Sequence, residues 1–204
     1  MNEPSTLWKT PGSERDADRA PTGAVASWIL FWGVAVALVV LDQGAKFLAL
    51  AGLDPARPVP ILPGLFELRL VFNPGAAFSL FPGGRWLFIL ISMGAFFFIP
   101  WYLRGLLHQG VTGSISAIGL GLILGGAIGN AIDRLFRHEG LVVDFFHAFW
   151  NGHSFPVFNV ADSAITIGIG SLILATLWAK PCPGGSREET GEKAEEERDV
   201  AGSL

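Results

Sequence analysis

Four long apolar stretches constrain the fold of this 204-residue chain more than any other feature of its sequence. They cover roughly residues 25–50, 86–103, 113–132 and 159–179. A helix needs about 17 to 25 mainly apolar residues to cross a hydrocarbon core about 30 Å thick. Half of all residues are hydrophobic and the mean hydropathy is positive, which is rare in a soluble domain of this size. The sequence therefore predicts a membrane protein, an all-α bundle of four transmembrane helices.

The third apolar stretch carries glycines at a spacing of four residues, namely Gly121, Gly125 and Gly129. Small residues at this spacing let two helix backbones approach each other closely inside a membrane. The alternative is that these glycines only make the segment flexible. We expect close packing of this helix against a neighbour.

The two ends of the chain are polar. Residues 1–24 are too long and too acidic for the basic start of a cleaved signal peptide, so we expect a cytoplasmic leader before a retained first helix. Residues 181–204 hold seven acidic and three basic residues, which predicts a disordered acidic tail. The membrane domain would span residues 25–180. Four crossings place both ends on the same side of the membrane, and we expect that side to be the cytoplasm.

The two longer connections, residues 53–85 and 133–158, fall on the opposite side of the membrane. In the first, several prolines and a partly alternating run predict a short strand or two within residues 58–82. In the second, aromatic side chains dominate residues 145–157. We expect this segment to lie along the membrane interface and to clamp a peptide as a lid.

Eight polar residues stand where the apolar stretches meet these connections. Because stretches one and three run toward that side and stretch four starts from it, all eight side chains can share one depth. They are Asp42, Lys46, Asn130, Asp133, Arg134, Asp144, Asn159 and Asp162.

Most of these residues favour a structural or a substrate-binding role. Asp42 and Lys46 are four residues apart on one helical face, in the order that stabilises an ion pair. Asp133 is expected to pair with a nearby arginine, and Arg134 can hold a carboxylate through two parallel hydrogen bonds. Asn73, Asn130 and Asn159 do not titrate, so we expect them to orient carboxylates, to hold the backbone or to bind substrate carbonyls.

Asp144 and Asp162 remain as candidates for proton transfer. An ionised carboxylate inside a membrane costs at least about 2.5 kcal/mol on insertion scales, so a chain keeps one there for pairing or for use. Two carboxylates in one pocket of low dielectric do not both ionise easily, so one keeps a proton while the other acts as a base. This is the requirement of aspartic peptidase chemistry, in which either residue can be the initial base.

Other chemistries have less support in the sequence. His108 falls on the opposite side from the other three histidines, which lack the spacing of metal ligands, so we expect no metal and no cofactor. Cys182 has no partner for a disulfide, and Ser163 has no obvious histidine or lysine base beside it. The chain contains no glycine-rich phosphate-binding signature.

Two other classes of protein also carry charges at membrane depth. A small ion- or proton-coupled transporter needs such charges along a path through the bilayer, and the second apolar stretch has none between Arg85 and Arg104. A structural assembly factor leaves the pair of Asp144 and Asp162 unexplained.

Five motifs, in order within residues 28–178, resemble those of lipoprotein signal peptidase, or signal peptidase II. They are Asp42-Gln-Gly-Ala-Lys46, Asn73-Pro-Gly-Ala-Ala-Phe78, Gly125-Gly-Ala-Ile-Gly-Asn-Ala-Ile-Asp-Arg134, Val142-Val-Asp-Phe145 and Phe155-Pro-Val-Phe-Asn-Val-Ala-Asp-Ser163. Five motifs in one order are far more specific than any single one of them.

The resemblance implies four transmembrane helices, a small periplasmic β-cradle and an interfacial periplasmic segment. It also implies an aspartic endopeptidase of the bacterial inner membrane, which cleaves diacylglyceryl-modified prolipoproteins on the N-terminal side of the lipidated cysteine. The catalytic pair would be Asp144 and Asp162. Residues that bind substrate or support this pair would be Asp42, Lys46, Asn73, Gly75, Asn130, Asp133, Arg134, Asn159 and Ala161.

The partners that the resemblance implies are prolipoprotein substrates, membrane lipids and the inhibitory cyclic peptide globomycin. We further expect a monomer that has no nucleic-acid partner.

Overall fold

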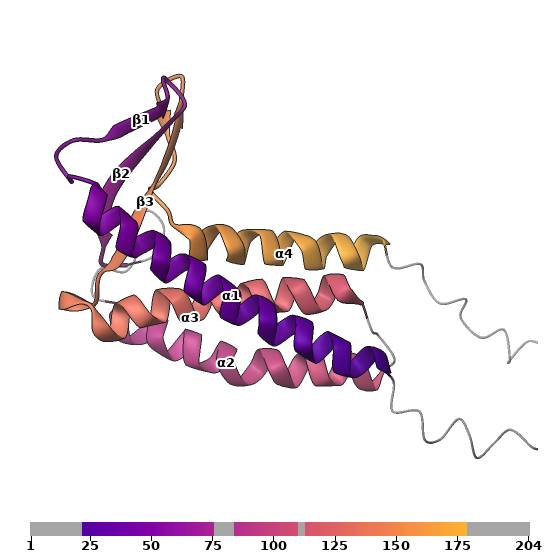
Figure 1. Ribbon diagram of the computed structural model, residues 1–204. Helices are drawn as coiled ribbons and strands as arrows, with labels where there is room; N and C mark the ends of the chain where they lie inside the picture. The colour runs from indigo at the N-terminus through magenta and orange to yellow at the C-terminus, as the bar shows by residue number, and fades with distance from the viewer. Residues whose placement is uncertain (1–21, 76–83, 110–112, 179–204) are drawn as a thin grey trace, which may run out of the picture.

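Four long helices form a bundle in the computed structural model, which describes residues 22–75, 84–109 and 113–178. All four are long and apolar enough to cross a membrane, so the four predicted transmembrane helices are confirmed. The first described residues of the bundle and the last lie at the same end of it (Figure 1). The helices are α1 (Thr22–Gly52), α2 (Arg85–His108), α3 (Ser114–Phe136) and α4 (Val160–Trp178).

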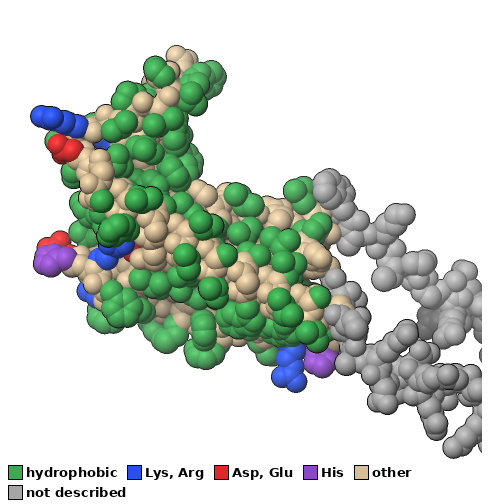
Figure 2. All heavy atoms as spheres, viewed as in Figure 1, with side chains coloured by type: hydrophobic (Ala, Val, Ile, Leu, Met, Phe, Trp, Pro, Cys, Tyr) green, Lys and Arg blue, Asp and Glu red, His purple; other side chains and the backbone are tan. Residues whose placement is uncertain are grey.

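The flanks of this bundle are apolar. Figure 2 shows hydrophobic side chains covering the sides of the helices, while charged side chains gather near the two ends. Large apolar side chains such as Ile29 and Phe97 are mostly exposed on these flanks. A surface of this kind is stable against lipid and unfavourable in water, and the protein is therefore a multi-pass membrane protein.

Helix α3 lies at the centre of the bundle and packs against each of the other three helices. A methyl group added to Gly121 would lie 2.7 Å from the carbonyl oxygen of Phe31, and one added to Gly125 would lie 2.8 Å from that of Ala35. These distances are too short for a side chain, so glycine is required where α3 meets α1. The predicted close packing at the glycines is confirmed, and the alternative of mere flexibility does not account for these contacts.

A four-stranded antiparallel sheet stands at the end of the bundle that lies away from the start of α1 and the end of α4 (Figure 1). Its order is β1 (Val59–Leu62), β2 (Phe66–Asn73), β3 (Val142–Trp150) and β4 (His153–Ser154). The first two strands fall within the predicted β-like segment 58–82, of which residues 76–82 lie outside the described residues.

The connection between α3 and α4 contributes more to this sheet than the sequence suggests. Residues 145–157 are predicted as an interfacial segment separate from the strands, but β3 pairs with β2 along most of its length and turns back through β4. Its aromatic and β-branched residues favour a strand once a partner strand is present. That this hairpin lies along the membrane interface stays a prediction.

Candidate active site

A buried ion cluster joins the sheet end of α1 to that of α3. Lys46 Nζ lies 2.8 Å from Asp42 Oδ2 and 2.9 Å from Asp133 Oδ2, and all three side chains are 0% exposed. Arg137 Nε donates to the other oxygen of Asp133 at 2.7 Å. Buried charges are stable only when each is paired and hydrogen-bonded, which is the case here. The expected pairing of Asp42 with Lys46 is present, and the arginine beside Asp133 is Arg137.

This cluster also holds the backbone of the elements around it. Asp42 Oδ1 accepts a hydrogen bond of 2.9 Å from the backbone N–H of Ala161, at the start of α4. Asp133 Oδ2 accepts one of 3.1 Å from the backbone N–H of Val143, in β3. The cluster therefore ties α1, α3, α4 and the sheet together directly behind the two aspartates of interest.

Arg134 binds carbonyl groups, whereas the sequence suggests a carboxylate partner. Its guanidinium donates to the carbonyl oxygens of Asn130, at 3.1 Å, and Gly75, at 2.9 Å, and lies over the ring of Phe88. Gly75 therefore contributes to the site through its backbone carbonyl oxygen, which accepts the hydrogen bond from Arg134. Arg134 thereby holds the turn that follows β2.

Asp144 is buried in β3, between two amide groups. Asn73 Nδ2 donates to its Oδ2 at 2.9 Å, and Asn159 Nδ2 donates to its Oδ1 at 2.7 Å. A β-bulge in β2, between Leu68 and Val71, shifts the register of the strand and brings Asn73 to this position.

The surroundings of Asp144 change its acidity. Burial raises the pKa of the Asp144 carboxyl to about 7, because it removes water from the charged form. The amide donors of Asn73 and Asn159 oppose this rise in pKa, and the nearby charge of Asp162 adds to it. Near neutral pH Asp144 is therefore poised between its neutral and its ionised form.

Asp162 occupies the first turn of α4. Its Oδ1 accepts a hydrogen bond of 2.8 Å from Asn130 Nδ2, and its Oδ2 accepts one of 3.2 Å from the backbone N–H of Asn159. The side chain of Asn159 in turn accepts a bond of 2.9 Å from the backbone N–H of Asp162. This reciprocal cap fixes the position of the Asp162 carboxyl at the start of α4.

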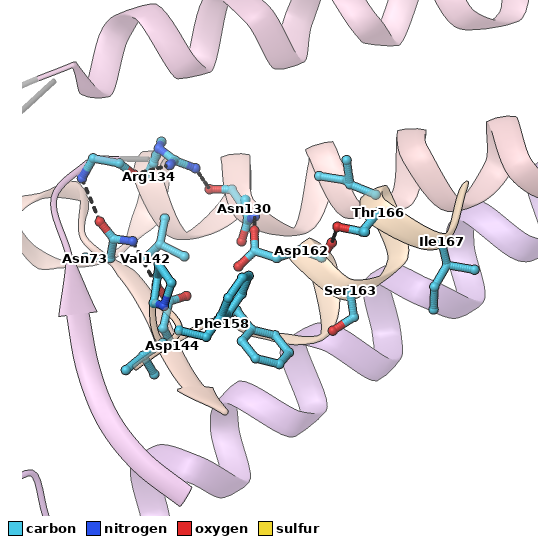
Figure 3. Close-up of a pocket in the computed structure, with 15 residues that line it drawn as sticks. Asn73, Asn130, Arg134, Val142, Asp144, Phe158, Asp162, Ser163, Thr166 and Ile167 are labelled. Atoms are coloured by element: carbon cyan, nitrogen blue, oxygen red, sulfur yellow. Dashed lines mark hydrogen bonds between the residues drawn. The ribbon is translucent and has the colours of Figure 1, made fainter. Parts of the chain in front are cut away.

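Asp144 and Asp162 line the same cavity, which has a volume of about 510 Å³. Figure 3 shows both side chains there, Asp144 beside Asn73 on the sheet and Asp162 beside Asn130 on the bundle. The remaining walls are largely apolar and come from residues 155–158 and from α4. Two acids that are 18 residues apart in the sequence thus face one space of low polarity.

The predicted site residues form two layers around this cavity. Those that line it are Asn73, Gly75, Asn130, Arg134, Asp144 and Asp162. Those that lie behind it and hold the first group in place are Asp42, Lys46, Asp133, Asn159 and Ala161.

Two residues behind the cavity, Gln43 and Arg137, were not predicted from the sequence. Gln43 donates to the carbonyl oxygen of Gly129 at 3.0 Å and to Asp133 at 3.2 Å, and Arg137 donates to Asp133. The four-residue spacing from Asp133 to Arg137 is a signal that could have identified that pair. Within the described ranges, no three His, Cys, Asp or Glu side chains come close enough together to hold a metal ion.

Comparison with known proteins identifies the family to which this chain belongs. Residues 34–178, which include the whole described site, match the family model of Signal peptidase (SPase) II. This chain belongs to the signal peptidase II family. The match leaves out the whole polar leader and the whole acidic tail, so the family assignment rests on the membrane domain.

Curated members of the signal peptidase II family are similar over most of their length. The protein named lipoprotein signal peptidase from Geobacillus kaustophilus (strain HTA426) is 42% identical over 139 residues, which is 68% of this chain and 87% of that relative. The one from Symbiobacterium thermophilum is 40% identical over 141 residues, which is 69% of this chain and 90% of the relative.

Two solved structures, each described as a bacterial membrane enzyme, share the fold. One superposes with a TM-score of 0.63 at 28% identity, over 71% of this chain and 85% of the other. The second has a TM-score of 0.62 at 28% identity, over 72% of this chain and 92% of the other. The predicted fold, a four-helix membrane bundle with a small sheet, is confirmed.

Proposed function

We propose that this protein is an aspartic endopeptidase that removes signal peptides from diacylglyceryl-modified prolipoproteins. One observation carries the proposal: Asp144 and Asp162 line a single, largely apolar cavity at the end of a membrane bundle. Membership of the signal peptidase II family supports the substrate class. The cut falls on the N-terminal side of the lipidated cysteine, and the enzyme acts as a monomer.

Each aspartate has surroundings suited to one role. Asp144 holds the proton, since its burial raises its pKa to about 7. Asp162 is the base, and its two oxygens accept hydrogen bonds from Asn130 and from the backbone N–H of Asn159. In the resting enzyme the two carboxyl groups share one proton.

The reaction then follows general acid–base chemistry. Asp162 takes a proton from a water molecule as the water oxygen attacks the scissile carbonyl carbon. Asp144 donates its proton to the carbonyl oxygen, which gives a neutral tetrahedral diol. Asp162 returns its proton to the amide nitrogen as the C–N bond breaks, and a hydroxyl proton of the diol restores Asp144. Two products form, an acid and an amine, and both carboxyl groups regain their starting state.

The cavity wall suits an apolar substrate. Ile165, Thr166 and Ile167 of α4 line it, and Ile167 is 61% exposed on the flank of the bundle, which faces lipid. A signal peptide and the acyl chains of a lipidated cysteine can therefore enter from the bilayer while the scissile amide reaches the carboxylates. Asn73, Asn130 and Arg134 supply hydrogen-bonding groups at that point.

We place the enzyme in the bacterial inner membrane, with the site near the periplasmic face and both termini in the cytoplasm. The sheet end of the bundle, where the site lies, is opposite the start of α1 and the end of α4, which supports placing the site and these two helix ends on different sides of the membrane (Figure 1).

The decisive experiment is cleavage of a diacylglyceryl-modified precursor by purified enzyme in detergent. Asp144→Asn and Asp162→Asn should each lower turnover by at least about a thousandfold, because each removes a proton-transfer group. Asp54→Asn is the matched control, because Asp54 is an exposed acid that lines no part of the cavity and contacts only Arg57, at 3.9 Å, and the backbone N–H of Ala56. Near-normal turnover by either variant of the pair would disprove the assignment. Globomycin should block the wild-type reaction, and a chelator should leave it unchanged.

A further inference from the structure

A second cavity, of about 420 Å³, lies beside the first. The two share Asn73, Asp144 and the segment 155–157. Asp144 therefore lies where the two cavities meet. A peptide bond held at this carboxyl has open space on both of its sides.

The walls of the two cavities differ in chemistry. The first continues along α4, past Ile165 and Ile167. The second is bounded mainly by the sheet, where Arg69, His147 and Ser154 contribute polar groups that the first cavity lacks. One cavity thus suits an apolar ligand that comes from lipid, and the other suits a polar one.

The polar end of the second cavity is held rigidly. His147 is buried, and its Nδ1 lies 2.8 Å from Glu67 Oε1 while its Nε2 lies 2.7 Å from Ser154 Oγ. These two hydrogen bonds join β2, β3 and β4. Since Phe155 follows Ser154 directly and lines both cavities, the same bonds position the wall between them.

The accessible charge of the second cavity is positive. Arg69 is exposed on β2 at the cavity wall. Glu67, two residues before it, is engaged with His147 and does not line the cavity. The acid that does line it is Asp144, at the end shared with the catalytic cavity.

We infer that the second cavity binds the part of the substrate that follows the lipidated cysteine, and that Arg69 favours acidic residues there. The inference rests on the proposed function. The substrate peptide extends in both directions from the scissile amide beside Asp144. The apolar signal peptide and the acyl chains match the first cavity, which leaves the second for the polar chain on the mature side.

The test uses two diacylglyceryl-modified precursors that differ only at the second and third residues after the modified cysteine, Asp-Asp in one and Lys-Lys in the other. The ratio of their kcat/KM values should favour the acidic precursor by about two- to fivefold, the range expected of an exposed charge pair. Arg69→Glu should reverse the ratio, and Arg69→Gln should bring it to about one. Thermal unfolding of both variants in detergent shows that they are folded.

Arg57→Glu is the matched control, because it makes the same change of charge at an exposed arginine that lines neither cavity. This variant should keep the wild-type ratio. A ratio that is unaltered by Arg69→Glu, or altered equally by Arg57→Glu, overturns the inference. Failure of the proposed function is a different result, because the wild type would then cleave neither precursor, or Asp162→Asn would cleave both.

Discussion

Lys46 lies between two carboxylates in the interior of the bundle, where it neutralises Asp42 on one side and Asp133 on the other. All three side chains are fully buried, so their charges must be balanced inside the protein, where Asp133 also pairs with Arg137. The cluster also holds the backbone at Val143 and Ala161, which are the chain neighbours of Asp144 and Asp162. Stability and the geometry of the site therefore depend on the same ion pairs.

Lys46→Met should destabilise the protein by about 3–5 kcal/mol, because it leaves the buried carboxylate of Asp42 without a cation and that of Asp133 with Arg137 alone. The free energy of unfolding, measured in detergent, checks this. Arg57→Met is the control, since it removes an exposed cation and should change stability by no more than about 0.5 kcal/mol. Equal effects of the two substitutions would contradict the structural role of Lys46.

The raised pKa of Asp144 predicts the direction in which stability depends on pH. In the unfolded chain an aspartate has a pKa of about 4, whereas burial raises it to about 7 in the folded protein. The folded state thus binds the proton more tightly, and the stabilisation from this group is present below pH 4 and is lost as the pH rises toward 7.

Thermal unfolding of the wild type and of Asp144→Asn between pH 4 and pH 8 measures this effect. The melting temperature of the wild type should fall relative to that of the variant as the pH rises from about 4 to about 7. A wild type that gains stability relative to the variant over this range would show that the carboxyl is held ionised. Activity should also decline above about pH 7, as the shared proton is lost.

At the scale of elements, helix α3 determines how closely the bundle can pack. Its glycines meet α1 on one side and α4 on another, where an added methyl group on Gly126 would lie 2.5 Å from the carbonyl oxygen of Ala161. Asn130 and Asp133 continue the same helix toward the sheet. Because the backbones are so close, the polar side chains of α1, α3 and α4 reach one another directly.

Gly125→Ala should destabilise the protein by about 1–3 kcal/mol, because its methyl group would collide with the backbone of α1 at Ala35. The control is Gly94→Ala in α2, where an added methyl group meets nothing within 4 Å. That variant should be neutral or more stable, since alanine favours a helix over glycine. Similar losses of stability in both variants would mean that helix propensity, and not packing, explains the glycines.

For the whole molecule, the path of the chain brings the two aspartates together. The chain leaves the bundle at the end of α3, forms β3 and β4, and returns to α4. Asp144 lies on the outward part and Asp162 at the point of return, so both reach one cavity (Figure 3). The α1 start and the α4 end lie at the opposite end of the bundle (Figure 1).

This arrangement predicts a sided pattern of chemical labelling in bacterial cells. In a chain whose Cys182 is replaced by serine, Arg57→Cys should react with a membrane-impermeant maleimide added outside the inner membrane. Gln109→Cys, at the other end of the bundle, should react only after the inner membrane is permeabilised. The reverse pattern would place the site on the cytoplasmic side and refute the proposed orientation.

The membrane bundle could be predicted from the sequence because hydropathy is a local property. Each apolar stretch is long enough to span the bilayer whatever its neighbours do. The same is true of the ion pair between Asp42 and Lys46, since one helical turn brings them together. The cost of a charge at membrane depth singled out the two aspartates, and the ordered motifs supplied the family.

Only the tertiary structure decided which residues meet across the chain. Residues 142–150 form a strand because β2 is there to pair with them, and strand pairing is not encoded at short range. Arg134 donates to the carbonyl oxygen of Gly75 because the turn after β2 lies beside its guanidinium. Its residue type alone had suggested a carboxylate partner. The two cavities that meet at Asp144 depend on the same non-local contacts, so local pattern predicts the acids but not the space around them.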